Sequence, residues 1–152
     1  MKHFLSLCLV LTICISCSKD KEQTVDFTAQ NEKEITEFIA NNKLTAQKSD
    51  TGLYYVINDP GTGAQPTATS NVTVAYKGTF INGQVFDQST NAGIKIGLNQ
   101  VIKGWTEGIQ HFKVGGSGIL LVPAHLGYGS YDYNGIPGGS VLIFEITLIS
   151  VN

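Results

Sequence analysis

Glycine and charge are distributed unevenly along this chain of 152 residues, and that contrast constrains its fold more than any single motif does. All 17 glycines lie at Gly52 or later, whereas 12 of the 22 charged residues fall between Lys19 and Asp50. A charged, glycine-free segment and a glycine-rich, weakly charged one are expected to form different structures. We therefore place a boundary between about residues 43 and 50, followed by a single globular domain, because the chain is too short for two full domains.

The first residues of the chain predict export. Lys2 precedes an apolar run from Phe4 to Ile15, which is typical of a signal peptide and too short to cross a bilayer core of about 30 Å. Ile15-Ser16-Cys17 resembles a bacterial lipobox, so Cys17 is expected to carry lipid, with simple secretion as the alternative. We expect a signal peptide at residues 1–16 and a lipoprotein anchored to the outer membrane of a Gram-negative bacterium, on the periplasmic face or the cell surface.

The cysteines and the basic residues limit the other chemistry of the chain. All three cysteines, Cys8, Cys14 and Cys17, lie in the leader, so a disulfide framework is not expected in the folded part. Cys14 and Cys17 have the spacing of a redox or metal pair, but they lie in the apolar leader without a second pair nearby. All ten basic residues are lysine, and the arginine fork that grips phosphate is absent, so nucleic acid is not an expected partner.

Residues 17–43 are expected to form a lipidated tether and one amphipathic helix. The segment from residue 18 to about residue 28 is polar and without periodicity, which suits a flexible tether. The helix is expected to begin with Thr28 as its N-cap and to end near Asn42. Its apolar stripe consists of Ile35, Phe38 and Ile39. Because so short a stripe is a poor dimerisation seam, we expect the helix to pack on the domain of a monomer, with dimerisation as the alternative.

Beyond Leu44 the apolar pattern changes to a period of two, and β-branched and aromatic residues become frequent, which predicts strands. The expected strands are Leu53 to Ile57, Val72 to Phe80, Val85 to Asp87, Ser117 to Val122 and Val141 to Val151. Asn82-Gly83 predicts a tight hairpin, and only Ile102 to His111 has a helical pattern. The expected fold class is therefore α+β, with a mostly antiparallel sheet and one helix covering one face.

Alternation within two of these strands predicts which side chains face the core. Val72, Val74 and Tyr76 share one face of their strand. In the last strand the expected inward set is Leu142, Phe144, Ile146 and Leu148, and Glu145 is expected to face outward. The segments Gln88 to Gln100 and Pro123 to Ser140 have no predicted element, and long structured loops of this kind are usually functional.

Several short motifs run in register from about Leu53 to the C-terminus. They are Val72 to Gly78, Asn82 to Asp87, Val101 to Gly108, Val114 to Gly116, Leu126 to Gly129, and Gly135 to Pro137 followed by Leu142 to Glu145. In this order they resemble the FKBP-type peptidyl-prolyl cis-trans isomerases. The resemblance implies a curved antiparallel sheet wrapped around a short helix, with an apolar pocket between them, and assigns residues 44–152 to the isomerase domain.

The resemblance also implies an aromatic pocket. Trp105 would form its floor, and its walls would be Tyr76, Phe86 and Phe144. Ile94 lies where the family commonly has a further aromatic wall, and a second proline is frequent where this chain has Gly138. Taken singly, each aromatic residue is more often part of a core than of a site, so their joint occurrence carries the assignment.

The remaining site residues implied by the resemblance lie at the rim of that pocket. Val101 and Ile102 would supply the rim, with the Ile102 backbone N–H donating to a substrate carbonyl. The Tyr128 hydroxyl would donate to another carbonyl, and Ile136 would close the side. Asp87 would lie at the polar edge, where the family often supplies an arginine partner that this chain lacks.

The function implied by the resemblance is rotation about X–Pro bonds, assisting the folding of exported proteins. Amide resonance opposes this rotation with a barrier of about 18 to 20 kcal/mol. The expected partners are proline-containing segments of unfolded or exported proteins, the macrolide ligands of the family are candidate partners, and no metal or cofactor is implied. The alternative is a binding module, a holdase or surface adhesion module that grips proline segments with little turnover.

Overall fold

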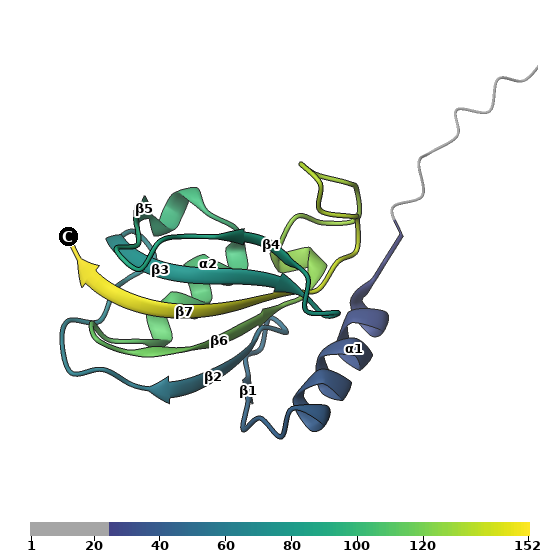
Figure 1. Ribbon diagram of the computed structural model, residues 1–152. Helices are drawn as coiled ribbons and strands as arrows, with labels where there is room; N and C mark the ends of the chain where they lie inside the picture. Colours follow the sequence, from purple (N-terminus) through teal and green to yellow (C-terminus); the bar gives the residue numbers. More distant parts are fainter. Residues whose placement is uncertain (1–24) are drawn as a thin grey trace, which may run out of the picture.

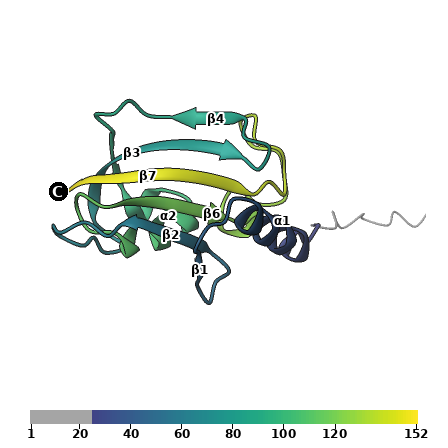
Figure 2. The same ribbon diagram turned by 60° about the horizontal axis from the view of Figure 1, so that its bottom comes forward.

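The computed structural model describes residues 25–152 as a curved sheet with a helix on each face (Figure 1). The expected signal peptide, Cys17 and most of the expected tether lie outside the described residues. Helix α2 (Lys103–Gly108) lies against the concave face, and α1 (Thr28–Asn41) lies against the opposite, convex face near one end, as Figure 2 shows from below. No helix in this described part has the length and apolar composition needed to cross a membrane.

The sheet has seven strands, and every pairing is antiparallel. The strands are β1 (Gln47–Lys48), β2 (Tyr54–Asp59), β3 (Asn71–Phe80), β4 (Val85–Gln88), β5 (Ile94–Gly97), β6 (Ser117–Val122) and β7 (Leu142–Val151). Their order is β1-β2-β6-β7-β3-β4, and β5 also pairs with β3. This architecture confirms the expected α+β class and the β3–β4 hairpin around Asn82-Gly83.

Two strands were not expected from the sequence. β1 has only two residues, which is too short for a periodic pattern to appear. β5 alternates only over Ile94-Lys95-Ile96 before Gly97, and it lies in the segment for which no element is predicted. β5 extends the sheet beside β3, and through Ile94 and Ile96 it contributes to the cavity described below.

The concave face holds the main core, and the alternation of β7 determines which residues reach it. Leu142, Phe144, Ile146 and Leu148 all belong to this buried cluster, as expected. Helix α2 packs closely on β6 because two of its positions are glycine. A Cβ at Gly104 would lie 2.5 Å from Val122 Cγ1, and one at Gly108 would lie 2.5 Å from Leu120 Cδ1. The close approach sets Trp105, which lies on the same helix, against the sheet.

The convex face holds a second, smaller apolar cluster beneath α1. Ile35 is 1% exposed, and its neighbours in this cluster are Tyr54, Val56, Leu121, Val141 and Ile143. The helix therefore packs on the domain, as expected from its short stripe. Its predicted N-cap is wrong by one residue: Phe27 occupies the cap position, and Asp26 Oδ1 accepts the Thr28 N–H at 2.9 Å. The Asp26 carboxylate thus satisfies one of the helix's free N–H groups.

Candidate active site

An apolar cavity of about 460 Å³ lies between α2 and the concave face of the sheet. Its lining residues are Tyr76, Phe86, Asp87, Ile94, Ile96, Gln100, Val101, Ile102, Trp105, Tyr128, Tyr133 and Phe144. The structure thus brings together eight of the nine side chains named from the sequence. The ninth, Ile136, does not line the cavity, because it is buried in the adjoining core with 9% of its surface exposed.

Four aromatic rings from four different elements form the inner part of this cavity. Trp105 comes from α2, Tyr76 from β3, Phe86 from β4 and Phe144 from β7. The Trp105 and Phe144 ring centroids are 5.1 Å apart with the planes at 81°, and the Tyr76–Trp105 and Phe86–Phe144 pairs have the same edge-to-face geometry at 4.9 and 5.5 Å. Such contacts are the favoured arrangement of aromatic pairs, so the rings hold one another in place.

Packing, and not hydrogen bonding, holds Trp105 at the base of the cavity. The indole is 5% exposed, and its Nε1 is the only buried side-chain polar atom without a hydrogen-bond partner within residues 25–152. An unpaired buried donor costs about 1 to 3 kcal/mol. The fold tolerates this cost at the one residue around which the other rings are arranged.

A hydrogen bond between the side chains of Tyr76 and Asp87 forms the polar edge of the cavity. The Tyr76 hydroxyl donates to Asp87 Oδ2 at 2.5 Å, which gives this carboxylate a partner in a chain without arginine. Burial, and then the neighbouring Asp87 carboxylate, raise the pKa of Tyr76 well above its usual value. The phenol therefore stays protonated at neutral pH and keeps its hydrogen on Asp87.

One free backbone donor lies at the rim, where α2 begins. The Ile102 carbonyl accepts the N–H groups of Trp105 and Thr106 at 2.9 and 3.1 Å. Within the described part of the chain, the Ile102 N–H has no protein acceptor. The first N–H groups of a helix have no partner inside the helix, so this donor is free to meet an acceptor that enters the cavity.

Comparison with known proteins agrees with this geometry. The sequence profile of the FKBP-type peptidyl-prolyl cis-trans isomerase family matches residues 63–149. The chain belongs to this family. It is 39% identical to the FKBP-type peptidyl-prolyl cis-trans isomerase FkpA of Aeromonas hydrophila over 126 residues, which are 80% of this chain and 47% of FkpA. It is 40% identical to the outer membrane protein MIP of Legionella longbeachae over 142 residues, which are 83% of this chain and 61% of MIP.

A solved structure shows the same fold. The crystal structure of FkpA from Escherichia coli superposes with a TM-score of 0.74 at 37% sequence identity, covering 82% of this chain and 61% of that one. The chain spans about half the length of the FkpA sequences it matches.

The outer rim of this FKBP-type pocket is a stacked pair of tyrosines on the long loop between β6 and β7. The Tyr128 and Tyr133 ring centroids are 4.9 Å apart with the planes at 11°, and both rings line the cavity while staying partly exposed. Burial, followed by the nearby Tyr133 and Asp87, raises the pKa of Tyr128. Its hydroxyl is therefore a hydrogen-bond donor throughout the neutral range.

Tyr133 was missed in the sequence, although a signal for it is present. Tyr133-Asn134-Gly135-Ile136 forms a two-residue turn in which the Tyr133 and Ile136 backbones exchange hydrogen bonds of 2.9 and 2.8 Å. Asn134 and Gly135 have φ angles of 46° and 84°, as a type I′ turn requires. The Asn-Gly pair thus presents Tyr133 to the cavity and turns Ile136 into the core. Ile94, which the resemblance placed at a wall position, also lines the cavity, and Ile96 and Gln100 are further lining residues with no role assigned from the sequence.

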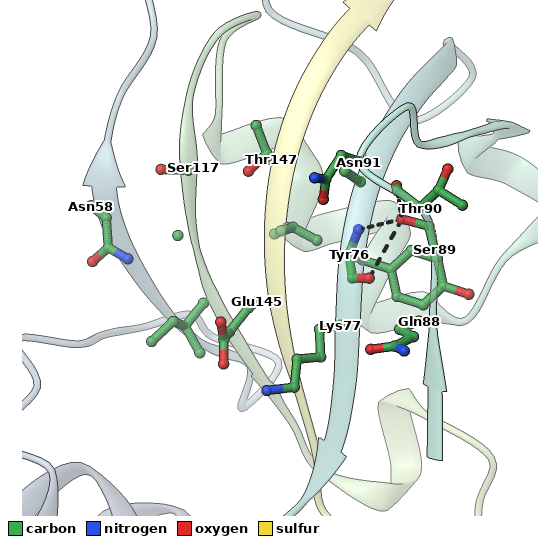
Figure 3. A pocket seen from close by; sticks show the side chains of 14 residues that line it. Asn58, Tyr76, Lys77, Gln88, Ser89, Thr90, Asn91, Ser117, Glu145 and Thr147 are labelled. Atoms are coloured by element: carbon green, nitrogen blue, oxygen red, sulfur yellow. Dashed lines mark hydrogen bonds between the residues drawn. The ribbon is translucent and has the colours of Figure 1, made fainter. Parts of the chain in front are cut away.

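A second hollow, of about 490 Å³, lies on the convex face of the sheet (Figure 3). Its labelled side chains are almost all polar, and Lys77 and Glu145 project from paired positions of β3 and β7. Ser89 accepts the Tyr76 N–H at 2.9 Å, so part of this polar surface completes the sheet's own hydrogen bonding. Within residues 25–152 no three histidine, cysteine or acidic side chains cluster as metal ligands would. We therefore place the candidate active site in the aromatic cavity.

Proposed function

We propose that this protein is a peptidyl-prolyl cis-trans isomerase that acts on proline-containing segments of exported proteins. The observation that carries the proposal is the apolar, aromatic cavity with hydrogen-bond donors at its mouth, in a chain of the FKBP-type family. Trp105, Tyr76, Phe86 and Phe144 would enclose the proline ring. Val101 and Ile102 would form the rim, and Ile136 would support the side from within the core.

The proposed chemistry needs only desolvation and positioning. Water stabilises the planar amide by solvating its dipole. When the proline ring is held among Trp105, Phe86 and Phe144, the adjoining X–Pro amide loses part of that water. The Ile102 N–H and the Tyr128 hydroxyl would hold the flanking carbonyls in a twisted geometry, while Asp87 keeps the Tyr76 hydroxyl engaged. A transition-state stabilisation of about 5 kcal/mol corresponds to roughly 10³ to 10⁴ in rate.

A protease-coupled assay on an X–Pro peptide with residues 17–152, the chain without its expected signal peptide, tests this function. Catalysed isomerisation is the expected result. Binding of the peptide without any acceleration would instead favour the alternative, a holdase or adhesion module with little turnover. The feature that favours this alternative is Ile94, which is exposed and stands at a position where the family commonly has an aromatic wall.

We also propose that the chain is exported and anchored by lipid at Cys17. The supporting observations are the leader of residues 1–16, the lipobox-like sequence and the similarity to a protein named for the outer membrane. In this proposal residues 17–43 comprise the tether and α1, and residues 44–152 the isomerase domain. Cys17→Ser should move the protein from the membrane fraction to the supernatant with its circular dichroism unchanged. A substituted protein that still pellets with membranes contradicts the lipid anchor.

A further inference from the structure

The long loop that carries Tyr128 is closed at its base by a side chain from α1. Asn31 is completely buried, with 0% of its surface exposed. Its Oδ1 accepts the backbone N–H of Ala124 at 2.8 Å, and its Nδ2 donates to the backbone carbonyl of Gly139 at 2.9 Å. Ala124 and Gly139 lie at the two ends of the loop, so one side-chain amide bridges both.

Two further hydrogen bonds turn this bridge into a closed circuit. The Gly129 N–H donates to the Ala124 carbonyl at 2.8 Å, and the Gly139 N–H donates to the Gly129 carbonyl at 2.9 Å. Starting from Asn31, the bonds therefore run through Ala124, Gly129 and Gly139 and return to Asn31. Both backbone groups of Gly129 are used in this circuit, and Gly129 directly follows Tyr128.

The segment that leads into α1 makes two more contacts with the loop, and this end of α1 lies beside the loop in Figure 1. The Phe27 ring packs on Gly139, where an added Cβ would lie 2.4 Å from Phe27 Cε1. The Ser130 hydroxyl donates to the Val25 carbonyl at 2.8 Å. The segment that enters the domain is thus joined to the loop at several points.

We propose that Asn31 is a positioning residue for the isomerisation reaction, which holds the loop so that the Tyr128 hydroxyl and the Tyr133 ring stay at the mouth of the cavity. This inference rests on the proposed function. Its chemical basis is that the Ala124 N–H can only donate and the Gly139 carbonyl can only accept. A side-chain amide supplies an acceptor and donors together, a carboxylate supplies acceptors alone and an aliphatic side chain supplies neither. Removing the amide leaves two buried backbone groups without partners.

The test compares Asn31→Leu with Ile35→Ala on the same helix. Ile35 is also buried, but its neighbours are the apolar cluster of the convex face and not the loop circuit. For Asn31→Leu we expect kcat/KM on an X–Pro peptide to fall about tenfold, the effect of losing one well-placed hydrogen bond. Amide hydrogen exchange should become faster at Gly129 and Gly139 than in the wild type. For Ile35→Ala the melting temperature should fall, while kcat/KM and these two exchange rates stay within about twofold when measured well below the melting temperature.

The outcomes separate this inference from the proposed function. Equal losses of kcat/KM in both variants, or unchanged exchange at Gly129 and Gly139 in Asn31→Leu, would overturn the positioning role. A wild type without isomerase activity overturns the proposed function, and with it the catalytic part of the inference; the exchange rates then still show whether Asn31 fixes the loop. If the bulkier leucine prevents Asn31→Leu from folding, Asn31→Ser, whose side chain is smaller than that of asparagine and has one hydroxyl, carries the same two measurements.

Discussion

The two faces of the sheet come from the same strands but differ in chemistry. On β7, Phe144 faces the concave cavity, and the next residue, Glu145, faces the convex hollow. On β3, the Tyr76 ring packs against Trp105, and the next residue, Lys77, projects to the opposite side. At these positions strand alternation therefore places the aromatic cavity on one face and the polar hollow on the other. Of these two hollows, the aromatic cavity is the one that can take up a proline ring away from water.

The largest effect is expected from removing an aromatic wall of the concave face. Phe86→Ala should lower kcat/KM by about 30-fold, corresponding to about 2 kcal/mol of transition-state stabilisation, because water then enters beside Phe144. Phe86 is half-buried, so circular dichroism should remain that of the wild type.

The matched control lies on the convex face. Glu145→Ala changes an exposed residue next to Phe144 in the sequence, and kcat/KM should stay within about twofold. Similar losses for Phe86→Ala and Glu145→Ala would remove the distinction between the faces.

A smaller effect is expected at the mouth of the cavity. We expect the Tyr128–Tyr133 stack to contact an aromatic side chain beside the proline. Tyr133→Ala should therefore lower the ratio of kcat/KM for Phe-Pro over Ala-Pro peptides about fivefold, which is the size of one aromatic pair contact. Tyr131→Ala is the control, because Tyr131 is an exposed tyrosine of the same loop that does not line the cavity. If both variants change the ratio equally, the Tyr128–Tyr133 stack has no special part in specificity.

The smallest effect is expected from pH. The pKa values of Tyr76 and Tyr128 are both raised above the ordinary tyrosine value, so neither hydroxyl loses its proton in the neutral range. Because the proposed mechanism transfers no proton, kcat/KM should vary by less than about twofold between roughly pH 6 and 8.5. A bell-shaped profile in that range that disappears on replacing His111, His125 or Asp87 would show that acid–base catalysis takes place.

The sequence predicts the concave face better than it predicts the way the loop is fastened. The alternation of Phe144 and Glu145 and the family motifs depend on local order, and the folded chain brings eight of the nine named side chains into one cavity. Asn31 could not be found in this way, because its partners lie 93 and 108 residues further along the chain. A polar residue on an amphipathic helix is normally expected to face solvent.

β5 and Tyr133 were missed for different reasons. β5 is four residues long, and alternation over so few positions does not stand out from the surrounding loop. Tyr133, in contrast, precedes an Asn-Gly pair that predicts a tight turn, so the signal was present in the sequence. What the pair could not indicate is that the turn would stack Tyr133 on Tyr128, since that depends on how the whole loop folds back.

Nuclear magnetic resonance of the labelled protein with an X–Pro peptide tests the central claim most directly, because one titration reports both the binding face and the turnover. We predict shift changes at the Trp105 indole N–H, the Ile102 amide and Tyr128, none at Lys77 or Glu145, and exchange cross-peaks between the cis and trans forms of the peptide. Shift changes confined to the convex hollow, or concave binding without cis–trans exchange, would contradict the claim that the aromatic cavity is an isomerase site.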